Sequence, residues 1–174
     1  MRIFLYQDRT LNLNLEALSK GLKNITKGEL DIDVGRAEFK LKKGPMKYPL
    51  THQSLSASLL NEVQDADYAL LLTKVPYENN YFYETEDKVT ILSFYAWEHL
   101  TDLPRENGVV FFLASLLRYS LPLPEAHQLT TGCINDFLWD KSSVDSMMRS
   151  TSLCKSCQAH LARRKLRWRP AYLK

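Results

Sequence analysis

Four residues near the C-terminal end of the chain have types and spacing that suit a metal ion. His127 is separated from Cys133 by five residues, and Cys154 and Cys157 follow as a Cys-x-x-Cys pair. Zinc prefers four tetrahedral ligands from thiolate sulfur and imidazole nitrogen, and two thiolates on one tight turn can reach adjacent corners. The spacing therefore predicts that these four residues bind one Zn²⁺ ion. Because protein atoms would fill every corner, the ion would be structural and its binding free energy would stabilise the fold.

Two alternatives compete with this ligand set. His160 lies three residues after Cys157 and is a convenient local choice for the fourth ligand. The cysteines could instead be small buried apolar residues, or the pair could be redox-active. A thioredoxin-like pair would follow a strand early in a βαβ unit, whereas this pair lies near the end of the chain. We therefore favour the metal site, in which Gly132 gives the backbone freedom to bring Cys133 inward.

Length and composition restrict the class of protein. The 174 residues are 45% hydrophobic, which is enough for one compact domain with a small appended subdomain. Three cysteines are too few for a disulfide scaffold. The sequence shows neither a secretory signal nor an apolar run of about 18 residues that could cross a bilayer. These features predict a cytoplasmic protein without a membrane partner.

The C-terminal residues 162–174 are basic. They carry six Lys or Arg and no acid, with Trp168 and Tyr172 interleaved, whereas the net charge of the whole chain is only +3. Such a tail could contact nucleic acid through cations on phosphate and aromatic rings on bases. A solvated, frayed terminus explains the same composition.

Hydrophobic periodicity predicts an α/β (α+β) fold with helices packed on a mixed sheet. A continuous apolar run, "DYALLLTKV", predicts a buried central strand. The predicted strands cover 2–6, 30–41, 67–75 and 89–95, with a hairpin-like segment at 76–88, and the predicted helices cover 13–27, 51–66 and 109–121. We expect an α/β domain at 1–126, a zinc knuckle at 127–161 packed on it, and the basic tail at 162–174.

The segment "DYALLLTKVPYENNYFYETEDKVTILSFY" and the downstream H-x5-C and C-x-x-C pattern resemble the archaemetzincins, a branch of the zincin metallopeptidases. In that family a helix bears HExxHxxGxxH, whose three histidines hold a catalytic zinc. Four cysteines hold a second, structural zinc. The resemblance covers about residue 50 to the end, and it implies a zincin-like domain with a C-terminal zinc knuckle.

The residues of the catalytic motif are replaced in this sequence. If His127 is the third histidine, the motif occupies "LRYSLPLPEAH", in which leucines stand at the first two histidine positions and Arg118 stands at the catalytic glutamate. Pro124 replaces the glycine. Gln128 replaces the first structural cysteine, which leaves His127 free to become the fourth ligand of the structural zinc. The replaced positions are Leu117, Arg118, Leu121, Pro124 and Gln128.

We therefore expect a catalytically inactive, metallopeptidase-like protein, a pseudoenzyme, that binds zinc and a protein or peptide. In zincins the edge strand pairs with extended peptide, so a retained cleft could bind a chain without cutting it. The first alternative is an atypical zinc-dependent peptidase that uses Glu98, His99 and Glu125. The second is a nucleic-acid-associated module acting through the tail. We also expect the apolar side chains of 136–148 to cover the knuckle, although an exposed Trp139 beside Asp136 would suit a partner surface.

Overall fold

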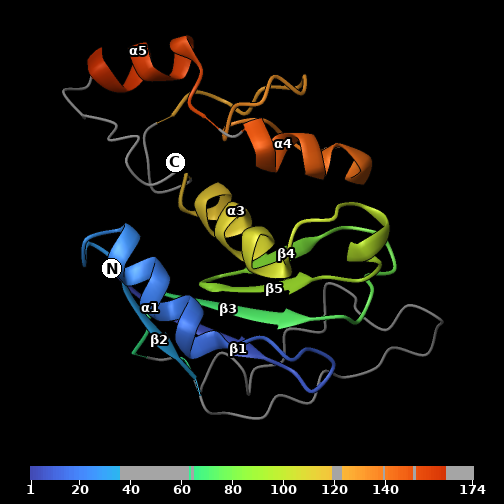
Figure 1. The fold of residues 1–174 in the computed structure, drawn as a ribbon. Helices are drawn as coiled ribbons and strands as arrows, with labels where there is room; N and C mark the ends of the chain where they lie inside the picture. The colour runs from blue at the N-terminus through green and yellow to red at the C-terminus, as the bar shows by residue number, and fades with distance from the viewer. Residues whose placement is uncertain (36–62, 64, 119–122, 139, 151, 164–174) are drawn as a thin grey trace. The chain divides into compact units, whose positions relative to one another are not determined.

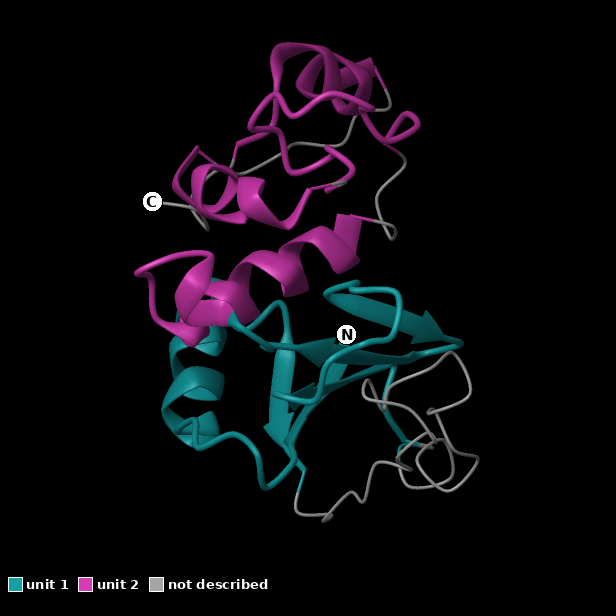
Figure 2. Ribbon diagram, turned by 90° about the vertical axis from the view of Figure 1, so that its right-hand side faces the viewer, with its two compact units in different colours: residues 1–96 teal, residues 97–174 magenta. Residues whose placement is uncertain are grey.

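The computed structural model describes residues 1–35, 63, 65–118, 123–138, 140–150 and 152–163 (Figure 1). The chain divides into two compact units, residues 1–96 and 97–174 (Figure 2). Most of the helix expected at 51–66 and most of the basic tail lie outside the described residues. The boundary expected between residues 126 and 127 stays a prediction.

The first unit is built on a five-stranded mixed sheet with the strand order β2-β1-β3-β5-β4. Strands β2, β1, β3 and β5 are parallel to one another, and β4 is antiparallel to β5. The strands are β1 (Arg2–Gln7), β2 (Asp31–Val34), β3 (Tyr68–Thr73), β4 (Tyr83–Glu86) and β5 (Val89–Ser93). The expected mixed α/β fold is therefore confirmed.

The apolar run in β3 occupies the centre of the sheet, as the sequence predicts. Five of its six residues are buried, because neighbouring strands flank it and both faces of the sheet are covered. One face carries a core cluster that includes Tyr6, Ala69, Leu71 and Ile91. The opposite face is equally buried and consists of Ile3, Leu5, Ile32, Leu70, Leu72 and Leu92.

Helix α1 (Leu15–Ile25) connects β1 to β2 and lies beside them (Figure 1). Asn14 caps its N-terminus, because the Asn14 side chain accepts a hydrogen bond from the Ala17 N–H at 3.0 Å. Leu15, Ser19 and Leu22 form its buried face. The Ser19 hydroxyl donates to the Ile32 carbonyl, which joins the helix to β2.

Gly35 follows β2 where a side chain has no room. A Cβ atom added there would lie 1.7 Å from a ring carbon of Tyr6, and Tyr6 belongs to the buried cluster. We expect Gly35→Ala to destabilise the protein by about 1–3 kcal/mol, because the ring must leave its packed position. The matched control is Gly21→Ala in α1, where nothing lies within 4 Å. It should stabilise the protein by about 0.5–1 kcal/mol through helix propensity. Urea unfolding of both variants tests the pair, and a Gly35→Ala protein as stable as Gly21→Ala would contradict it.

The second unit contains three α-helices in its described part, which are α3 (Arg105–Leu117), α4 (Val144–Ser150) and α5 (Lys155–Arg163). Helix α3 begins before the predicted start at residue 109, directly after Pro104. A proline is tolerated there because the first helical N–H groups have no intrahelical partner. Arg149 of α4 pairs with both Asp145 and Asp102, which ties α4 to the segment before α3. Within the described residues, no helix combines the length and apolarity needed to span a membrane.

Candidate metal centre

His127 and Cys133 lie on one loop that folds back on itself. The His127 N–H donates to the Asn135 carbonyl at 2.9 Å, and the Phe137 N–H returns a bond to the His127 carbonyl at 2.9 Å. Gly132 has a φ of +82°, which an L-residue with a side chain rarely adopts. A Cβ atom at Gly132 would also lie 2.8 Å from the Ser150 hydroxyl oxygen. Glycine at position 132 therefore allows the backbone conformation that brings Cys133 inward, as the sequence suggests.

The second pair of sulfurs comes from the start of α5. Cys154 directly precedes the helix, and Cys157 lies in its first turn with its side chain buried. The segment 152–154 runs beside 132–134, because the Ile134 N–H donates to the Ser152 carbonyl at 2.8 Å and the Ser152 N–H to the Gly132 carbonyl at 3.1 Å. This pairing brings the two distant segments together.

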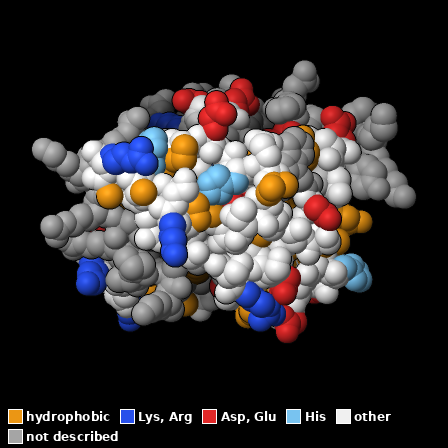
Figure 3. Space-filling view, turned by 90° about the horizontal axis from the view of Figure 1, so that it is seen from above, with side chains coloured by type: hydrophobic (Ala, Val, Ile, Leu, Met, Phe, Trp, Pro, Cys, Tyr) orange, Lys and Arg blue, Asp and Glu red, His pale blue; other side chains and the backbone are white. Residues whose placement is uncertain are grey.

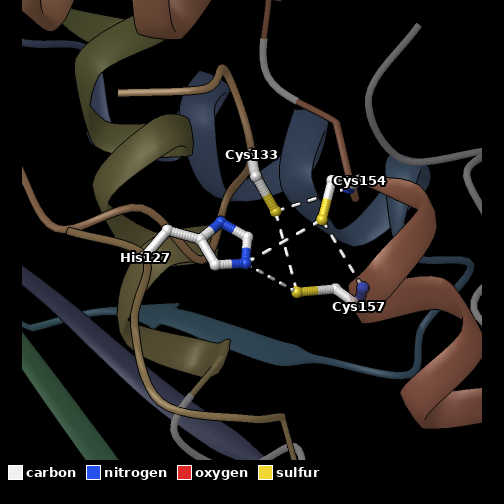
Figure 4. Close-up of side chains that lie close together, drawn as sticks. All are labelled: His127, Cys133, Cys154 and Cys157. Carbon is white, nitrogen blue, oxygen red and sulfur yellow. Dashed lines mark hydrogen bonds between the residues drawn. The ribbon is translucent and has the colours of Figure 1, made fainter. Parts of the chain in front are cut away.

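The four side chains point at a common centre (Figure 4). One ligand atom from each of His127, Cys133, Cys154 and Cys157 lies within 4.8 Å of all the others. His127 Nε2 is 3.4 Å from Cys157 Sγ and 3.9 Å from Cys154 Sγ. Cys133 Sγ is 3.9 Å from Cys157 Sγ.

These separations fit a tetrahedral zinc ion. With Zn–S bonds of about 2.3 Å and Zn–N bonds of about 2.0 Å, the edges of the tetrahedron are about 3.5–3.8 Å long. Three of the separations, from His127 Nε2 to the sulfurs of Cys154 and Cys157 and between the sulfurs of Cys133 and Cys157, are 3.4–3.9 Å and lie close to these edges. The remaining separations are within 4.8 Å. All three cysteines are free thiols and none forms a disulfide. The Cys₃His set could hold one zinc ion with every coordination position filled by protein.

Two of the three thiols, those of Cys133 and Cys157, resist ionisation. Burial, together with the neighbouring Cys154 and Cys133, raises the pKa of Cys157 to about 12. Burial likewise raises the pKa of Cys133. At Cys154 burial opposes ionisation, but hydrogen bonds from the Cys157 N–H and other neighbours outweigh it and lower the pKa. A divalent cation stabilises all three thiolates, so metal binding must release protons.

Asp136 is a buried carboxylate beside the cluster, and sequence reasoning did not assign it to the centre. It is 4% exposed, and its Oδ1 lies 2.8 Å from His127 Nδ1. Burial opposes its ionisation, but bonds from Thr131, His127 and Cys133 outweigh burial and lower the pKa of Asp136. Asp136 therefore does not lie on a partner surface, and Trp139 itself lies outside the described residues.

Amide groups surround the sulfurs. The Asn135 and Cys154 N–H groups each donate to Cys133 Sγ at 3.4 Å. The Asn135 side-chain amide lies 3.6 Å from Cys157 Sγ and also donates to the carbonyls of Pro124 and Glu125. These donors favour thiolate sulfur and fix the loop around it.

Arg118, at the C-terminus of α3, donates hydrogen bonds to the backbone of the same loop. Its Nη1 donates to the carbonyls of Ile134 at 3.2 Å and Asp136 at 2.9 Å. The residue is only 5% exposed. Arg118 is therefore a buried structural residue that fixes the backbone around Asn135.

The remaining predicted site residues lie elsewhere. Among the described residues, the metal-ligand group contains His127 and leaves out His160. Glu98 forms an ion pair with Arg105, and neither His99 nor Glu125 joins a group of three or more metal-binding side chains within the described part of the chain. The basic tail can be followed only to Arg163.

Figure 3 shows one face of the molecule, on which the coloured basic and acidic side chains are interspersed among small hydrophobic groups.

No protein-family model matches the sequence, and no curated protein matches it. Solved structures do match. An archaemetzincin from Methanopyrus kandleri is 17% identical, with 94% of each chain covered and a TM-score of 0.56. A zinc-dependent peptidase from Methanocorpusculum labreanum is 14% identical over 91% of this chain and 99% of its own, with a TM-score of 0.56. An archaemetzincin from Archaeoglobus fulgidus, complexed with malonate, is 18% identical over the same shares, with a TM-score of 0.51.

These likenesses extend over nearly the whole chain, so they include both the mixed sheet and the segments that carry the cysteines. At 14–18% identity they establish the fold alone. The fold of this chain is archaemetzincin-like.

Proposed function

We propose that this chain is a catalytically inactive, archaemetzincin-like protein that binds one structural zinc ion and recognises a protein or peptide. His127, Cys133, Cys154 and Cys157 are the proposed zinc ligands. The ion braces the second unit and takes no part in a reaction, because a four-coordinate site filled by protein has no position for substrate or water.

The proposal depends on the contacts that two residues of the aligned catalytic motif make in this structure. Arg118, at the position of the catalytic glutamate, is buried and donates to the Ile134 and Asp136 carbonyls. His127, at the position of the third histidine, directs Nε2 at the cysteine sulfurs. An arginine in this bonding state cannot act as a general base, and a histidine in the cysteine cluster cannot also serve a separate catalytic ion.

The proposed peptide surface is the outer edge of β4. Among the described residues, β4 pairs with β5 on one side only. The Ser93 N–H donates to the Phe82 carbonyl, and bonded pairs alternate along an antiparallel ladder. The Thr85 and Thr90 pair is therefore non-bonded, so the backbone N–H and C=O of Thr85 point away from β5. An extended peptide can add to such an edge through main-chain hydrogen bonds.

Side chains around this edge favour a basic peptide that carries apolar residues. Glu86 and Asp87 are exposed at the end of β4, and Tyr81, which precedes the strand, is 55% exposed. Acidic residues on an edge also prevent pairing between sheets of two molecules. Attraction of a basic peptide and prevention of sheet pairing between two molecules are compatible with an edge that accepts selected peptides.

The test combines metal analysis with a peptide screen. We expect one zinc per chain by mass spectrometry of the native protein. Zinc-loaded protein should enrich extended peptides from a displayed library and leave them uncut. Thr85→Pro removes the outward N–H and should weaken peptide binding by about tenfold, or about 1.4 kcal/mol. The matched control is Thr85→Val, which keeps the N–H and should bind as the wild type does.

Two results would contradict the proposal. Peptide cleavage that disappears on chelation, with two zinc ions per chain, would favour the atypical peptidase. A zinc content near zero in protein purified without chelator would remove the metal site itself.

A further inference from the structure

Asp136 connects to the candidate metal centre through His127. Its Oδ1 accepts from His127 Nδ1 and from the Thr131 hydroxyl, each at 2.8 Å. Its Oδ2 accepts from the backbone N–H groups of Thr131 at 2.6 Å and Cys133 at 3.1 Å. Four donors therefore converge on one carboxylate whose side chain is fully buried.

We infer that Asp136 is the positioning residue of the metal centre, which fixes the tautomer and ring orientation of His127 so that Nε2 faces the sulfurs. The inference rests on the proposed zinc binding at His127, Cys133, Cys154 and Cys157. An ionised carboxylate only accepts hydrogen bonds, so His127 Nδ1 must carry the proton in this contact. The lone pair of a neutral imidazole then lies on Nε2, the nitrogen 3.4 Å from Cys157 Sγ.

Asp136 is itself held from two directions. The N–H groups of Thr131 and Cys133 fix its side chain, and Arg118 fixes its backbone carbonyl. Since Cys133 is also a proposed ligand, one carboxylate sets the positions of two ligands on the same loop. A metal-bound histidine whose second nitrogen is bonded to a carboxylate is more basic and better oriented than a free imidazole.

Asp136→Asn should break this arrangement while changing the size of the side chain very little. The amide oxygen can satisfy one pair of donors only. If it stays on the two backbone N–H groups, the NH₂ group faces His127 Nδ1, which must then become the acceptor. The proton moves to Nε2, and the ring then presents an N–H to the metal in place of a lone pair.

The experiment measures zinc affinity of the full chain by competition with a chromophoric chelator. We expect Asp136→Asn to weaken zinc binding by about 10- to 100-fold. The absorption spectrum of bound Co²⁺ should also change, because it reports the geometry of the ligands. Asp140→Asn is the matched control, since Asp140 lies on the same segment and caps the short helix at 141–143 through Ser142. This control should leave both readouts unchanged.

A double-mutant cycle separates positioning from a general effect on the fold. In a His127→Ala background three thiolates still bind metal, and Asp136→Asn should then change the affinity by less than about threefold. An equal loss with and without His127 would overturn the inference, as would wild-type affinity in Asp136→Asn. If the wild-type chain binds no zinc, the proposed function fails instead, so the two failures are distinguishable.

Discussion

Cys154→Ala is expected to remove the bound zinc and to lower the free energy of unfolding by several kcal/mol. Structural zinc sites contribute apparent binding free energies of about 10–16 kcal/mol near neutral pH, so losing one ligand forfeits a substantial part. Cys154 is the most informative cysteine to change, because it is partly exposed whereas Cys133 and Cys157 are buried. Replacing Cys154 by alanine leaves a smaller cavity than replacing either buried cysteine would. The fall in the free energy of unfolding therefore reflects the loss of the metal and not the loss of packing.

The measurement is a thermal melt combined with metal analysis of the same sample. A loss of several kcal/mol corresponds to a fall in Tm on the order of 10 °C for a chain of this size. Ser156→Ala is the matched control, since Ser156 lies between the two cysteines of the pair and is exposed. Both the zinc content and the Tm of this control should equal those of the wild type. An unchanged melt of Cys154→Ala with zinc still bound would refute the site.

Arg118→Met is expected to destabilise the protein by about 2–4 kcal/mol. Methionine fills much of the same volume but cannot donate, so the buried Ile134 and Asp136 carbonyls lose the hydrogen bonds they now accept. Leaving a buried polar group without a partner costs more than an average hydrogen bond contributes. Arg118→Lys keeps one donor group, so its free energy of unfolding should lie between those of Arg118→Met and the wild type.

The control for this prediction is Arg149→Met, the same substitution in the same unit. Arg149 pairs with Asp102 and Asp145 while about half exposed. Ion pairs with this exposure contribute about 0–1 kcal/mol, so the control should change stability little. Chemical denaturation of both variants at saturating zinc gives the comparison. Equal losses would show that Arg118 does not act through the buried carbonyls.

Prediction from sequence succeeded where a single physical signal dominates a segment. The apolar run of β3 could be buried only at the centre of a sheet, and its pairing with β1 and β5 confirms this. Cysteine and histidine are scarce in this chain, so few combinations can meet around one ion, and zinc binding by the four predicted ligands stays a prediction. The grouping of His127 with the three sulfurs has the expected composition.

Sequence reasoning failed where the outcome depends on contacts between distant segments. Helices α4 and α5 are only seven and nine residues long, too short for a helical period to stand out. The role of Asp136 depends on the bridge that brings residue 127 beside residue 136, and no local pattern encodes that bridge. Arg118 was recognised as a departure from the family motif, but its two carbonyl partners lie 16 and 18 residues further along the chain.

The strand order also determines when the first unit can be completed during synthesis. Strand β1 pairs with β2 on one side and with β3 on the other, yet β2 ends at Val34 and β3 begins only at Tyr68. A nascent chain that has reached the end of β2 therefore presents one edge of β1 whose backbone N–H and C=O groups still lack the partners that β3 supplies. Open strand edges of this kind promote wrong associations, and this edge of β1 is closed only once β3 has been synthesised and has paired with it.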